Sequence, residues 1–179
     1  IGDGMVGHWS AQTLAWRGCR VLLTGRHDER LALYESGPGD RCVNVRRESA
    51  VEAVRQWAPE GVQVVVDTVG SVPDVEALFP LMKKFGHIVS AGFCGHEGKI
   101  DIQAMRLKEL SLHAPAGWTR ERMDRTLALI ASGDLKTSHL ITHRFPAEKA
   151  GEAFRLILER PPDTHVLGVI LDWDTRGHK

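Results

Sequence analysis

IGDGMVG, residues 1–7, is the stretch that decides the fold, because it places Gly2, Gly4 and Gly7 in the order G-x-G-x-x-G. Between a strand and a helix, the first glycine permits a tight turn, the second lets a pyrophosphate approach the backbone, and the third lets the helix pack closely. The following segment, Met5–Arg17, has no proline and no glycine after Gly7, and is predicted to be that helix. A glycine-rich turn without a ligand is the alternative, and the helix-competent segment disfavours it.

Only Ile1 stands ahead of this turn, where the pattern requires a whole strand. We therefore expect an upstream strand in the natural protein. In the strand order 3-2-1-4-5-6 that strand is central. The 179 residues by themselves are accordingly expected to be neither a stable domain nor a catalyst.

Strand-like and helix-like segments alternate along the rest of the chain. The β-branched run Val62–Val66 is typical of a parallel strand buried on both faces. This alternation predicts an α/β fold with a doubly wound parallel sheet, truncated at its N-terminal strand. Further strands or extended segments are predicted over 21–25, 42–45, 87–93, 100–102, 109–114, 140–145 and 165–173, and helices over 27–36, 48–58, 73–84, 103–108, 119–133 and 146–160.

Composition excludes several classes of protein. Lys plus Arg and Asp plus Glu are both 23, so the formal net charge is zero and gives no support for nucleic-acid binding. No apolar stretch approaches the ~20 residues of a membrane span. The three cysteines, Cys19, Cys42 and Cys94, form no CxxC pair, which disfavours a disulfide framework or a structural zinc cluster and predicts a reducing, cytoplasmic setting.

The end of the second strand bears on the choice of dinucleotide. An acidic residue about 20 positions after the glycine turn would bind the ribose 2′-hydroxyl of NAD. The strand ends instead in Thr24-Gly25-Arg26, where Gly25 leaves space and the Arg26 guanidinium suits a 2′-phosphate. This arrangement favours NADP, while Asp28 or Glu29 swinging back would suit NAD.

The strings IGDGMVG, VLLTGRHDERL, VQVVVDTVGS, GHIVSAGF, LITHRFPAEKAGEAFRLI and VILDW resemble the medium-chain dehydrogenase/reductase superfamily, the zinc-type alcohol dehydrogenase-like proteins. The resemblance covers essentially all of residues 1–173, and LITHRFP followed by EAF is its most family-specific part. Within the superfamily, SAGF, Trp118, LITHRFP and VILDW look most similar to the bacteriochlorophyllide a dehydrogenase-like subgroup.

The resemblance implies a Rossmann-fold dinucleotide-binding domain over residues 1–145, with its first strand missing. Residues 146–179 would be a C-terminal helix and strand that return toward an absent, barrel-like catalytic domain. The implied function is the cofactor-binding portion of an NAD(P)-dependent oxidoreductase that transfers hydride between nicotinamide and a small alcohol or carbonyl substrate. The implied cofactor residues are Gly2, Gly4, Met5, Val6 and Gly7 at the pyrophosphate, Thr24, Gly25 and Arg26 at the adenosine ribose, Thr68, Val69 and Gly70 after the strand ending at Asp67, and Ala91, Gly92 and Phe93 against the carboxamide.

Metal and partner expectations follow from the same resemblance. In zinc-dependent relatives the ligands precede the glycine turn, so any zinc ligands would lie upstream of Ile1, and no catalytic residue is assigned within the chain. Cys94 and His96 form a lone C-x-H pair, which favours a loop cysteine and a surface histidine over a zinc site. A homodimer is expected through the extended segment Glu109–Ala114 at the sheet edge.

Two points stay open from the residues alone. Asp67, at a strand end, either shapes the following loop by bonding its backbone or simply ends the strand. The fold also suits a non-catalytic nucleotide-binding or regulatory module, because fold does not fix function.

Overall fold

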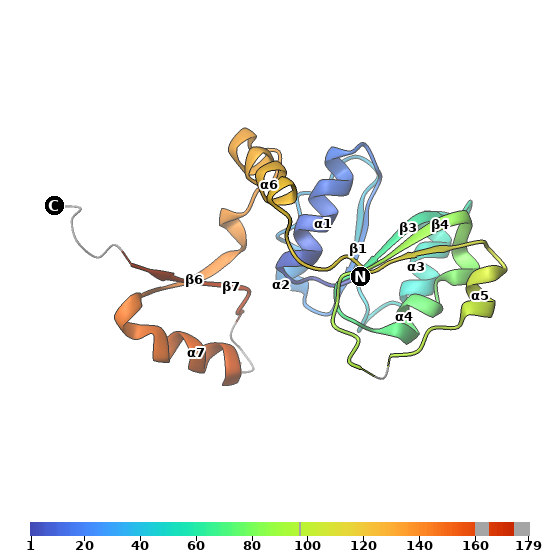
Figure 1. The fold of residues 1–179 in the computed structure, drawn as a ribbon. Helices are drawn as coiled ribbons and strands as arrows, with labels where there is room; N and C mark the ends of the chain where they lie inside the picture. Colours follow the sequence, from blue (N-terminus) through green and yellow to red (C-terminus); the bar gives the residue numbers. More distant parts are fainter. Residues whose placement is uncertain (97, 160–164, 174–179) are drawn as a thin grey trace. The chain divides into compact units, whose positions relative to one another are not determined.

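In the computed structural model, residues 1–96, 98–159 and 165–173 are described, and they form two compact units, Ile1–Leu135 and Lys136–Lys179. The first unit is the α/β sheet unit that carries the glycine turn (Figure 1). Its elements are α1 (Met5–Trp16), β1 (Leu22–Gly25), α2 (Asp28–Leu31), β2 (Arg41–Asn44), α3 (Ala50–Trp57), β3 (Val62–Asp67), α4 (Val72–Glu76), a 3₁₀ turn (Phe79–Leu81), β4 (Met82–Ser90), α5 (Ile102–Arg106), β5 (Ser111–His113) and α6 (Arg120–Ser132).

All strand pairs of the first unit are parallel. β1 pairs with β2, and β3, β4 and β5 follow one another in a second ladder. Parallel strands need crossover connections, and here helices supply most of them. The predicted α/β fold with parallel sheets is therefore confirmed.

Alternate residues of β1 face two different cores. Leu23 packs with Ala11 of α1 and Leu31 of α2, whereas Leu22 packs against the cluster that contains Val54 of α3 and Val65 of β3. Since side chains along a strand alternate between its faces, helices cover both sides of this sheet. This is the doubly wound arrangement that the sequence predicts.

Ile1 and Gly2 lie between β1 and β3 and connect the two ladders. The Ile1 nitrogen donates to the carbonyl of Val66, the Thr68 N–H donates to the carbonyl of Ile1, and the Gly2 N–H donates to the carbonyl of Thr24. Beside them a groove of about 370 Å³ is lined by both strands, Val21–Thr24 on one side and Val62–Val66 on the other. Val64 is accordingly 36% exposed, so the predicted burial of this strand on both faces is incomplete.

Three local predictions in the first unit are wrong. The helix predicted over 27–36 ends at Leu31, because Tyr34 is buried and its hydroxyl donates to Asp40. The helix predicted over 73–84 ends at Glu76, and the buried Met82 begins β4 instead.

The third wrong prediction is the extended segment over 100–102. The carboxylate of Asp101 accepts the backbone N–H groups of Gln103 and Ala104, so it caps α5 and Ile102 begins a helix. A side chain also caps α6, where Thr119 accepts from the Arg122 N–H, as its position before the helix predicts.

Among its described residues, the second unit has two short 3₁₀ turns (Ser138–Leu140 and Ala147–Lys149), two parallel strands and a helix. β6 (Ile141–Pro146) pairs with β7 (Gly168–Asp172), and α7 (Ala150–Glu159) follows the 3₁₀ turn Ala147–Lys149. Pro146 therefore ends the strand, and the helix predicted from Pro146 begins at Ala150. Within the described ranges, no helix is long and apolar enough to cross a membrane.

Candidate cofactor site

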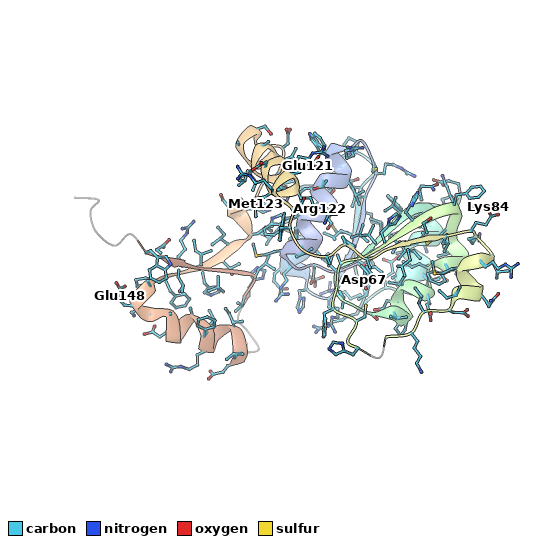
Figure 2. The ribbon with its side chains drawn as sticks, in the orientation of Figure 1. Asp67, Lys84, Glu121, Arg122, Met123 and Glu148 are labelled. Carbon is cyan, nitrogen blue, oxygen red and sulfur yellow. The ribbon has the colours of Figure 1, made fainter. Side chains whose placement is uncertain are left out.

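The carboxyl ends of β1, β3 and β4 meet around the glycine turn. Asp67, the last residue of β3, lies in Figure 2 where Figure 1 marks the amino terminus. Lys84, near the start of β4, lies at the far end of the strands (Figure 2). In open α/β sheets, ligands bind outside the carboxyl ends of the strands, so this end of the sheet is the candidate site.

Close contacts explain two of the three motif glycines. A Cβ on Gly7 would lie 1.9 Å from the carbonyl oxygen of Gly2, and a Cβ on Gly2 would lie 2.3 Å from the Thr68 hydroxyl oxygen. Gly2 also has a φ of +111°, in a region that side chains rarely adopt. A side chain at Gly7 would force α1 away from the turn, and one at Gly2 would displace the loop that follows β3.

Gly4 has a different environment, because no atom lies within 4 Å of the position its Cβ would take. It is the N-cap residue of α1 and no side chain caps this helix. The first N–H groups of a helix lack intrahelical partners and favour an anion. An open glycine ahead of a 12-residue uncapped helix fits a phosphate group.

Asp67 organises the loop that follows β3. Its side chain accepts the N–H of Val69 at 2.9 Å and that of Gly70 at 3.1 Å, and its carbonyl accepts the N–H groups of Ala91 and Gly92. Asp67 is 1% exposed, so these bonds satisfy a carboxylate that would otherwise be costly to bury. Of the two roles left open by the sequence, the geometry supports shaping the loop.

The loops after β3 and β4 touch through glycines. A Cβ on Gly92 would lie 2.1 Å from the Gly70 nitrogen, so both loops reach the site only because Gly92 lacks a side chain. Beyond this contact, Val69 is 47% and Phe93 79% exposed. Two apolar side chains are thus left open to solvent at the carboxyl end of the strands.

Asp3, inside the glycine motif, is the site residue that the sequence analysis missed. Its Oδ2 accepts the N–H of Arg26 at 2.7 Å, the N–H of His27 at 2.8 Å and the Nδ1 of His27 at 3.0 Å. A Cβ on Gly25 would lie 2.4 Å from this oxygen. The sequence does contain a signal for this contact, namely an acidic residue inside the glycine motif together with a glycine at the end of the next strand.

Burial acts to raise the pKa of Asp3, but the hydrogen bonds from His27 and Arg26 outweigh it and hold the pKa below its usual value. Arg30 adds a longer contact, with its guanidinium 3.9 Å from Oδ1. The Asp3 side chain is 9% exposed, so an ionised carboxylate lies just beneath the turn that ends β1.

The predicted residues fall into two groups that share this end of the sheet. Gly2, Thr68 and Val69 are in contact distance of one another, whereas Arg26 belongs to the separate turn above Asp3. Cys94 lies near the Ser90 hydroxyl at 3.6 Å, and in the part of the chain that is described no three His, Cys, Asp or Glu side chains gather as a metal site would require.

Comparison with known proteins agrees with this architecture. The zinc-binding dehydrogenase family model matches residues 6–132. The 2-desacetyl-2-hydroxyethyl bacteriochlorophyllide A dehydrogenase of Cereibacter sphaeroides is 36% identical over 109 residues, which are 61% of this chain and 33% of that protein. The chain therefore spans about a third of this relative's length.

Solved structures show the same fold at lower identity. A protein of Sinorhizobium meliloti 1021 bound to NADP, assigned to the zinc-binding dehydrogenases, matches with a TM-score of 0.79 and 23% identity over 95% of this chain and 50% of its own. An Escherichia coli CFT073 alcohol dehydrogenase complexed with NADH matches with a TM-score of 0.80 and 20% identity, over 96% of this chain and 50% of its own. From its family match and its fold, the chain belongs to the zinc-binding dehydrogenase family, of which it carries the cofactor-binding half.

Proposed function

We propose that this chain is the cofactor-binding portion of an NAD(P)-dependent oxidoreductase that acts on an alcohol or carbonyl substrate. The observation that carries the proposal is the glycine turn, with an open Gly4 ahead of the uncapped α1, at the carboxyl ends of β1, β3 and β4. Family membership supports it, and so do the NADP and NADH bound to two structural neighbours.

In this proposal, each loop has one task. Gly2, Gly4, Met5, Val6 and Gly7 hold the pyrophosphate, and the turn after β1 holds the adenosine ribose. The loops 68–70 and 91–93, fixed by Asp67, lie against the nicotinamide end. The bound cofactor supplies the hydride chemistry, while these residues bind and orient it.

The preference between cofactors is proposed to be for NADP, through Arg26. Arg26 is exposed beside Gly25, at the strand end where a 2′-phosphate would lie. We expect Arg26→Ala to weaken NADPH binding by ~1.5–3 kcal/mol, as for a hydrogen bond to a charged group, and to leave NADH binding nearly unchanged. Fluorescence titration with both cofactors measures this, and an equal loss for both would show that Arg26 does not contact the 2′-phosphate.

Titration with ATP distinguishes this function from that of a regulatory nucleotide-binding module. A chain that binds NADPH or NADH, with ATP much weaker, supports the oxidoreductase. Binding of ATP but of neither nicotinamide cofactor would contradict it.

Assembly and location complete the proposal. We propose a homodimer that forms through β5. We also propose that the enzyme is cytoplasmic, because all three cysteines are free thiols. We also propose that residues 1–145 form a dinucleotide-binding domain and that 146–179 add a C-terminal helix and strand.

A further inference from the structure

Asp3 places a negative charge beside two arginines and a histidine that follow β1. His27 donates to its Oδ2 at 3.0 Å, Arg30 lies 3.9 Å from its Oδ1, and Arg26 is joined to it through its backbone N–H. The turn after β1 and the start of α2 therefore surround a single carboxylate. The side chains of His27 and Arg30 contact that carboxylate directly.

Asp3 also takes the volume in which an acid at the strand end would lie. A side chain at position 25 would meet the Asp3 Cβ and carboxylate at 2.4 Å, so the two positions cannot both carry large side chains. The acid that commonly ends this strand binds the ribose 2′-hydroxyl and disfavours a 2′-phosphate. Here the carboxylate packed against Gly25 comes from Asp3, within the glycine motif itself.

We propose that Asp3 is a specificity-determining residue of the cofactor site, whose charge opposes the attraction of Arg26 and Arg30 for a 2′-phosphate and so limits the preference for NADP over NAD. This inference rests on the proposed nicotinamide-binding function. The proposed effect on cofactor preference comes from the charge of Asp3 and not from its hydrogen bonds. A single oxygen, Oδ2, accepts all three of those bonds from Arg26 and His27.

Asp3→Asn separates charge from geometry. The side-chain oxygen of asparagine can still accept the N–H groups of Arg26 and His27, while the negative charge is lost. We expect the affinity for NADPH relative to NADH to rise roughly tenfold, as for removal of one nearby charge at a partly screened site. Asp3→Ser removes the same charge with a smaller side chain and is expected to shift the ratio in the same direction.

The control is Glu60→Gln. It changes net charge equally, but Glu60 pairs with Arg20 ahead of β1, at the end of this strand away from the site. We expect it to leave the NADPH to NADH ratio unchanged. Both cofactors are titrated by fluorescence in the full chain and in each variant, and thermal melting of each variant is recorded beside them.

The outcomes are distinct. A rise in the ratio in either Asp3 variant, absent in Glu60→Gln, supports the proposal. Normal binding of both cofactors with an unchanged or lower ratio overturns it and leaves the proposed function intact. Loss of cooperative melting in both Asp3 variants would make Asp3 a structural residue and overturn the proposal, whereas an original chain that binds neither cofactor overturns both.

Discussion

Gly25 leaves room for the Asp3 carboxylate, because a Cβ at position 25 would occupy the same space. We expect Gly25→Ala to lower the free energy of unfolding by ~1–3 kcal/mol, because the new Cβ would meet the Asp3 carboxylate at 2.4 Å. Urea denaturation measures the loss. The same substitution in an Asp3→Gly background should cost at least ~0.5 kcal/mol less, since both the Cβ and the carboxylate that it would strike are gone. Equal costs in both backgrounds would mean that another contact is responsible.

The lowered pKa of Asp3 predicts a pH dependence of stability. A carboxyl whose folded pKa lies below its unfolded value stabilises the protein above the unfolded pKa, about 4. That contribution is lost as the pH falls through the lower, folded pKa. The free energy of unfolding of the original chain should therefore fall more steeply below about pH 4 than that of Asp3→Asn. Parallel curves from pH 7 to pH 3 would contradict this prediction.

At the scale of elements, the edge strand β5 carries the proposal of a dimer. β5 bonds only to β4 among the described residues, and its Leu112 is 41% exposed. An open edge of this kind is a natural surface for pairing with a second copy. We expect a dimer by light scattering at micromolar concentration, and a monomer for Leu112→Lys.

Leu127→Lys is the matched control for that experiment. Leu127 is 54% exposed on α6 and lies outside β5, so its replacement should leave the dimer intact. A chain that is monomeric without any substitution, or a Leu112→Lys variant that stays dimeric, would contradict pairing through β5.

The elements also show what the sequence could and could not predict. The parallel strands, α1 and the cap at Thr119 follow from local patterns, because β-branched runs, motif glycines and capping residues act within a few positions. The early ends of the helices near Tyr34 and Met82 do not, because each of these residues is buried in a core that distant segments build.

The candidate site also has a part that the sequence predicts and a part that it does not. Its glycines were readable from G-x-G-x-x-G, since the turn is a local requirement. Asp3 was not, because its role depends on a contact with Gly25 and Arg26, more than twenty positions away in the chain. A motif scheme treats the residue between the first two glycines as variable and so overlooks its charge.

At the scale of the whole molecule, the groove between β1 and β3 interrupts the sheet. Ile1 and Gly2 already bond to both strands at one end of it, in the manner of a central parallel strand. We expect an extended, β-branched segment of strand length, joined ahead of Ile1, to raise the melting temperature of the chain. Each backbone group it pairs would remove a cost of ~1–3 kcal/mol.

The experiment compares the 179-residue chain with and without that extension, and a glycine-serine extension of equal length is the control. Only the β-branched extension should raise the melting temperature. Equal cooperative melting of all three, with turnover of an alcohol by the shortest, would contradict both the strand in the groove and the expectation that these residues are no catalyst alone.

The hydrogen bond between His27 and Asp3 makes this histidine a built-in spectroscopic reporter. An ionised carboxylate can only accept, so the Nδ1 of His27 must carry the proton and, in the neutral ring, Nε2 is left unprotonated. The two ring nitrogens should therefore give well-separated ¹⁵N resonances, in contrast to the averaged signals of a histidine free to exchange tautomers. A dinucleotide that binds over the turn would shift these two ¹⁵N signals. Cofactor binding could then be measured without any optical change in the cofactor.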